Sequence, residues 1–252
     1  MKKKASKLGP LAVLSVVREL RRGAGDRRPL AVAGARELVP LLARELRAGG
    51  DASAVVEGRI DGAAALVWIG PPDEEQLRRA DRDDIPIVAV TDAAAVPYVL
   101  ATDLVRVPPG QGFPVEEIAA ALAGRLGENG TSLAARLPVL RRPVCAALTA
   151  SFARRNGLIA AAVFVPGVDL PVLTLNQVRL VLRIALAYGE ELDNRRALEL
   201  LGVVGAGFGF RAAARELLDL VPVAGWAVKG AVAYSGTRAI GEAAVRYFEA
   251  RK

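Results

Sequence analysis

The sequence predicts an α/β unit with a parallel sheet, followed by an all-α domain of apolar helices. Over residues 29–130, short apolar runs alternate with helical segments, which is typical of a parallel sheet covered by helices. Beyond residue 130 the strand patterns fade, and long stretches carry almost no charge. Because 52% of the 252 residues are hydrophobic, the chain can bury a sizeable core and is not a disordered protein. We therefore predict three segments, with boundaries at 1–28, 29–130 and 131–252.

The composition excludes several kinds of chemistry. The chain has no histidine and a single cysteine, Cys145. An intramolecular disulfide, an ordinary zinc site and a histidine general base are therefore ruled out. We expect Cys145 to be a small buried side chain, and we predict no catalytic residue, no metal and no cofactor.

The first segment is strongly basic. It carries nine Lys or Arg and two acids, a balance of +7, against −7 for residues 29–130 and +7 for residues 131–252. Apolar residues recur at helical spacing from Leu11 to Leu20 and predict an amphipathic helix with a basic flank. No cleavage site follows, so we do not expect a signal peptide. Two alternatives stay open: the helix packs on its own domain beside a solvated lysine tail, or the tail contacts anionic lipid headgroups.

The α/β unit is expected to contain five strands and three helices. Its strands are continuous apolar runs, as expected for strands that are buried on both faces. The predicted strands are residues 30–34, 52–57, 64–69, 85–90 and 104–107, and the predicted helices are residues 35–48, 73–82 and 116–126.

The loops after three of these strands lack the residues that a GTPase needs. After the first strand, Val39-Pro40-Leu41 stands where a phosphate-binding loop carries Gly, Lys and Ser or Thr. Gly70-Pro71-Pro72-Asp73 replaces the expected Asp-x-x-Gly, and Thr91-Asp92-Ala93-Ala94 replaces the expected Asn-Lys-x-Asp. By its order of elements and its Pro-Pro-Gly-Gln-Gly segment before the last helix, the stretch 29–128 resembles a degenerate G domain of the Era-like GTPases. The resemblance implies a pseudo-GTPase.

Two features of this unit leave alternatives open. Gly34 could admit an anion as part of a non-standard phosphate loop over residues 34–37, with Arg36 as its nearby cation, or it could simply permit a tight turn. The acids Asp73, Glu74 and Asp92 could hold a metal or serve in acid–base chemistry, or they could cap helices or face solvent. We expect the tight turn and the caps.

Two nearly uncharged stretches mark the helical domain. Residues 156–178 carry one charge, Asp169, and residues 220–237 carry one, Lys229. Each stretch is near the length needed to cross the hydrocarbon core of a bilayer. The Pro166–Pro171 segment is expected to break the first stretch into two short helices joined by a turn, with Asp169 capping the second helix.

Two arginine pairs lie at i,i+4 spacing in this domain, Arg179 with Arg183 and Arg211 with Arg215. They could reach lipid phosphates or pair with acids in a helix bundle, and the sequence leaves both open. The candidate acids are Glu190, Glu191 and Glu216. In the last helix, small residues on one face would allow close helix contact: Gly230, Thr237, Gly241 and Ala244.

The runs VPGVDLPVLTLNQVRLVLRIALAYG (165–189) and LELLGVVGAGFGFRAAARELLDLVPVAGWAVKGAVAYSGTRAIGEAAVRYF (198–248) carry a second resemblance. Together they resemble the helical domain known as domain-of-unknown-function family 697, over about residues 140–250. Members often follow G domains related to the Era-like GTPases, and many are membrane-associated. The resemblance therefore implies a membrane-associated helical domain and supplies no catalytic residues.

These observations predict a non-enzymatic scaffold or regulatory protein on the cytoplasmic side of the cell membrane. Its partner is unidentified, with a true GTPase and a second copy of the chain as candidates. Nucleic acid is not an expected partner, because the basic residues lie among apolar helices and few aromatics accompany them. The alternatives are a nucleotide-dependent switch with a non-standard phosphate loop and a soluble helical interaction module.

Overall fold

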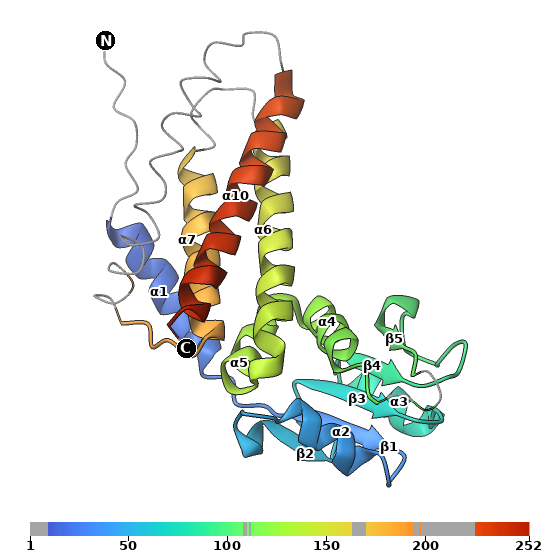
Figure 1. Ribbon diagram of the computed structural model, residues 1–252. Helices are drawn as coiled ribbons and strands as arrows, with labels where there is room; N and C mark the ends of the chain where they lie inside the picture. Colours follow the sequence, from blue (N-terminus) through green and yellow to red (C-terminus); the bar gives the residue numbers. More distant parts are fainter. Residues whose placement is uncertain are drawn as a thin grey trace, which may run out of the picture. The chain divides into compact units, whose positions relative to one another are not determined.

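The computed structural model describes residues 10–107, 110, 112–162, 170–193, 197 and 225–251. The chain divides into two compact units, both drawn in Figure 1. An α/β unit comprises Gly25–Ala147 and Ala187–Gly189, and a helical unit comprises Met1–Ala24, Leu148–Leu186 and Glu190–Lys252. The predicted fold class, a parallel α/β sheet followed by a helical region, is confirmed.

The α/β unit is built on a five-stranded sheet in the order β2-β1-β3-β4-β5, and all paired strands are parallel (Figure 1). Each predicted strand is present, although every strand after the first is shorter than expected. The elements in chain order are β1 (Leu30–Gly34), α2 (Val39–Leu46), η1 (Ala52–Ala54), β2 (Val55–Glu57), β3 (Ala65–Ile69), α3 (Glu74–Arg82), β4 (Ile87–Val90), η2 (Ala101–Asp103), β5 (Leu104–Val105), α4 (Val115–Leu126), η3 (Gly127–Asn129), α5 (Gly130–Arg136) and η4 (Pro138–Leu140).

Both faces of the sheet are buried, which explains why its strands are apolar throughout. One face packs against Leu77 and Ala80 of α3. Alternate residues point to the other face, where Val32 and Val67 are fully buried. Helices α2 and α4 contact the strands as well. The strand residues on the α3 face are Ala31, Ala33, Leu66, Trp68, Ile87 and Ala89.

The α/β unit extends further along the chain than the predicted boundary at residue 130. Arg136 at the end of α5 is the reason, because its side chain reaches back to the start of the unit. Its guanidinium pairs with Asp51 at 3.0 Å and donates to the carbonyl of Arg27 at 3.0 Å. Hydrogen bonds from Ser53, with the charge of Arg136, lower the pKa of Asp51 to about 2. Helix α5 therefore belongs to the α/β unit rather than to the helical one.

Within the residues that the structure describes, the helical unit contains α1 and three longer helices. Helix α6 begins in the α/β unit and continues into the helical unit. Close contacts show that α10 runs antiparallel to α6: a Cβ atom added to Gly230 would lie 3.0 Å from the carbonyl of Gly157, and one added to Gly241 would lie 2.4 Å from Oγ1 of Thr149. The predicted small-residue face of the last helix thus makes close helix contact. The helices are α1 (Pro10–Ala24), α6 (Arg141–Ala162), α7 (Leu170–Ala187) and α10 (Gly225–Glu249).

Helix α1 packs within the helical unit rather than forming a separate segment. Its Val16, Val17 and Leu20 are buried, as the amphipathic pattern predicted. On its outer side, Glu19 pairs with Arg179 of α7 at 3.0 Å, and Arg21 donates to the carbonyl of Leu192. The lysine tail lies outside the described residues.

Candidate functional site

The first candidate site is the carboxyl edge of the sheet, between β1 and β3. Doubly wound sheets bind ligands where neighbouring strands lead in opposite directions. Here β1 leads to β2 on one side, whereas β3 leads to β4 on the other. The candidate phosphate loop, residues 34–37, follows β1 at this point. The conformation of that turn therefore determines whether an anion can enter.

The main chain closes this crevice. Gly34 has φ +122°, and a Cβ atom added there would lie 2.0 Å from the carbonyl oxygen of Ile69 at the end of β3. The next amide, that of Ala35, donates to the same oxygen at 2.8 Å. The amide of Gly70 donates to the carbonyl of Val90 at 2.9 Å, and a Cβ added to Gly70 would lie 2.9 Å from the Cβ of Ala35. Backbone hydrogen bonding thus continues one residue beyond the strands, across the crevice.

Backbone amides at the start of α2 also have hydrogen-bond partners. Those of Leu38 and Val39 both donate to the carbonyl of Ala35 at 3.0 Å. Pro40, in the first turn of the helix, has no N–H to offer, and no side chain caps this end. An anion site at a helix N-terminus depends on free amides. The geometry therefore supports a tight turn at Gly34, and α2 begins at Val39 instead of at the predicted residue 35.

The acids near this edge act as caps or face solvent. Asp73 caps α3, because its carboxylate accepts from the amides of Glu75 and Gln76, both at 3.1 Å. Glu74 and Asp92 are exposed. Across the described residues, no group of three or more His, Cys, Asp or Glu is placed to hold a metal ion. Asp73 is therefore a helix N-cap, as the sequence predicted.

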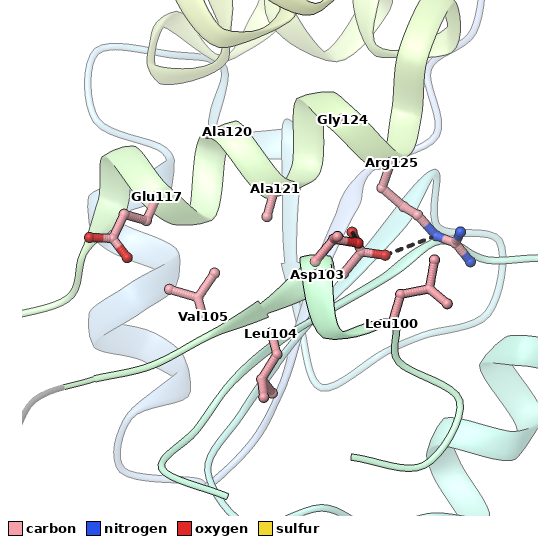
Figure 2. Close-up of a pocket in the computed structure, with 10 residues that line it drawn as sticks. Leu100, Asp103, Leu104, Val105, Glu117, Ala120, Ala121, Gly124 and Arg125 are labelled. Atoms are coloured by element: carbon pink, nitrogen blue, oxygen red, sulfur yellow. Dashed lines mark hydrogen bonds and ion pairs between the residues drawn. The ribbon is translucent and has the colours of Figure 1, made fainter. Parts of the chain in front are cut away.

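A groove of about 610 Å³ lies between the edge strand β5 with η2 and the outer face of α4 (Figure 2). At its right-hand end in Figure 2, Asp103 pairs with Nε of Arg125 at 3.5 Å. Asp103 is only 6% exposed and also accepts from the hydroxyl of Thr102 at 3.2 Å. The ion pair links η2 to α4, so we assign this groove a structural role. Asp103 was not predictable from the sequence, because no periodic pattern marks a single acid in a loop.

The second candidate site is a buried polar layer in the helical unit, formed by Asn156 of α6, Asn176 and Gln177 of α7, and Thr237 of α10. All four are at most 5% exposed. The hydroxyl of Thr237 accepts from Nδ2 of Asn156 at 2.9 Å and from Nε2 of Gln177 at 3.0 Å, and it donates to the carbonyl of Ala233 at 2.8 Å. Asn176 donates to Oδ1 of Asn156 at 2.8 Å. The layer therefore ties three helices together through one hydroxyl.

This layer was not predicted as a site. Gln177 lies within the 165–189 run, and Thr237 lies on the small-residue face of the last helix. Buried amides and hydroxyls need partners, so isolated polar residues within uncharged stretches are the signal that could have identified it. Chemically, the layer offers hydrogen bonds and no titratable group, and its arrangement fits a role in fixing how the helices meet.

The structure describes only some of the residues that the sequence singled out in the helical domain. Pro171 lies in the first turn of α7. Arg179 is half-buried and pairs with Glu19 of α1 at 3.0 Å. Arg183 is half-buried on the same helix. The remaining predicted residues lie outside the described part of the chain: Pro166, Asp169, Arg211, Arg215 and Glu216. Cys145 is buried, as expected.

None of the helices in the described part of the chain is both long and apolar enough to span a membrane. Comparison with known proteins found no match among family models, curated proteins or solved structures.

Proposed function

We propose that this chain is a non-enzymatic, membrane-associated scaffold or regulatory protein, in which a pseudo-GTPase unit is joined to an apolar helical domain. One observation carries the non-enzymatic part. At the place where a doubly wound sheet binds nucleotide, the amide of Ala35 and the carbonyl of Ile69 hydrogen-bond to each other at 2.8 Å. Of the amides that follow β1, those of Ala35, Leu38 and Val39 already donate to main-chain carbonyls.

The chemistry of the loops supports the same proposal. A phosphate-binding loop needs a lysine to neutralise charge and a hydroxyl to hold magnesium, and Pro40 and Leu41 stand at those positions. The membrane-associated part rests on the two nearly uncharged stretches and on the resemblance to family 697. The role of such a protein is to present surfaces to a partner, for which a true GTPase is a candidate.

The non-enzymatic part is tested by calorimetry of the full chain with GTP, GDP and ATP in the presence of magnesium. We expect no saturable heat with any of the three. Saturable binding at micromolar nucleotide would instead support a switch with a non-standard loop. In that case Arg36→Gln should abolish the binding, since Arg36 is the cation of that turn, whereas Arg78→Gln on α3 should leave it unchanged.

A further inference from the structure

We infer that one end of the helical unit is a docking surface for anionic lipid headgroups. This inference rests on the proposed membrane association and names the surface that makes it. The surface, called here the helical tip, consists of the exposed apolar side chains Leu158, Val172, Val228 and Val232 together with the cations Arg154 and Lys229.

The four apolar side chains lie at one level of the bundle. That level is set by a close contact between Gly157 and Gly230 and by a hydrogen bond of 3.4 Å from Asn156 to the carbonyl of Leu173. Each exposed apolar residue is one or two positions along its helix from Gly157, Leu173 or Gly230. At about 1.5 Å per residue, this separation is at most about 3 Å along the helix axis. In Figure 1 this is the end where α6 finishes and where α7 and α10 begin.

The exposure of these side chains is unusual for the unit. Leu158 is 72% exposed, Val172 48%, Val232 38% and Val228 37%. Within the described residues, all the exposed large apolar side chains of the helical unit are these four; the others, Leu38, Leu41, Tyr98 and Leu100, belong to the α/β unit. Apolar side chains gathered at one end mark an interaction surface more strongly than scattered ones do.

The charges around the tip identify the occupant. Arg154 lies one turn from Leu158 on the same face of α6, and Lys229 lies beside Val228 on α10; both cations are exposed. The described helix ends that form the tip, residues 154–162, 170–176 and 225–233, contain no Asp or Glu. The nearest acid along these described helices is Glu242, ten residues beyond Val232.

Apolar side chains flanked by basic ones, with no acid in the described helix ends, match the interface of an anionic bilayer. Leu158 and the valines would enter the boundary between headgroups and acyl chains, and the long side chains of Arg154 and Lys229 would reach the phosphates. The tip would lie on the membrane and would not span it.

The test is co-sedimentation of the full chain with vesicles of phosphatidylcholine alone or of phosphatidylcholine with phosphatidylserine. We expect binding to the anionic vesicles, weakened by salt because the Debye length shortens. Arg154→Gln with Lys229→Gln should lower the affinity about 25-fold, from about 1 kcal/mol per cation. Leu158→Ser with Val232→Ser should lower the affinity at least about tenfold, because less apolar surface is then removed from water on binding.

Two matched variants control for charge and for apolarity at exposed positions of the α/β unit. Arg78→Gln with Arg82→Gln removes two exposed cations from α3, and Leu100→Ser removes a leucine that is 56% exposed. Both should bind anionic vesicles as the unaltered chain does. Unchanged melting of the tip variants by circular dichroism shows that they fold.

The outcomes separate the inference from the proposal on which it rests. Binding to anionic vesicles that the tip variants leave unchanged would overturn the tip and leave membrane association standing. Equal binding to both kinds of vesicle would overturn the selection of anionic lipid. Sedimentation of the chain with neither kind would contradict membrane association itself. If the leucine and valine changes convert a lipid-free dimer into a monomer, the tip is a contact between copies of the chain instead.

Discussion

Replacing Gly34 by alanine is expected to lower the free energy of unfolding of the α/β unit by about 4 kcal/mol. Part of this cost is backbone strain at φ +122°, worth about 1–3 kcal/mol. The rest is overpacking, worth about 1–3 kcal/mol, because the new methyl group would meet the carbonyl oxygen of Ile69 at 2.0 Å. That oxygen is main chain within the sheet and cannot move aside. Denaturant unfolding followed by circular dichroism measures the loss.

Gly62→Ala is the matched control for this change. Gly62 also has a positive φ, +71°, but a Cβ atom added there meets nothing within 4 Å. The control should therefore cost only about 1 kcal/mol, the price of a left-handed backbone alone. Equal effects at the two positions would show that the crevice beside Gly34 has room for a methyl group.

Replacing Thr237 by valine is expected to lower the free energy of unfolding of the helical unit by about 3 kcal/mol. Valine has nearly the same shape, but it removes the hydroxyl that accepts from Asn156 and from Gln177. A buried donor left without its acceptor costs about 1–3 kcal/mol. Thr237 is fully buried between the helices, so water cannot readily replace its hydroxyl.

Thr237→Ser distinguishes the hydroxyl from the methyl group. Serine keeps the acceptor and loses one methyl, so we expect a cost of about 1 kcal/mol. A larger loss for serine than for valine would mean that the methyl packing of Thr237, and not the polar layer, stabilises the bundle.

The elements of the sheet were predictable because buried parallel strands leave a simple signature. Runs such as 64–69 and 85–90 are apolar at every position, since both faces of the sheet are covered. The start of α2 was not predictable from periodicity. Residues 35–38, Ala-Arg-Glu-Leu, are compatible with the helix that follows. They form a tight turn instead, in which the amide of Ala35 donates to the carbonyl of Ile69 on the neighbouring strand.

Contacts between distant parts of the chain could not be predicted from the sequence. The α/β unit continues past the predicted boundary at residue 130 to Ala147, and nothing local in the sequence marks that Arg136 pairs with Asp51. Asn156 and Thr237 are likewise 81 positions apart and meet only when α6 and α10 pack. The absence of the phosphate-loop residues, by contrast, could be recognised from the sequence, because the residues of such a loop are neighbours in the chain.

Hydrogen exchange at the amides of Ala35 and Gly70 tests the closed crevice most directly. Both amides donate to carbonyls of neighbouring strands, at 2.8 and 2.9 Å, so exchange requires those bonds to open. We predict that both exchange as slowly as amides within β3 and that magnesium with GTP leaves the rates unchanged. Fast exchange at these two positions, or exchange that nucleotide slows, would show an open crevice that takes a phosphate and would contradict the account.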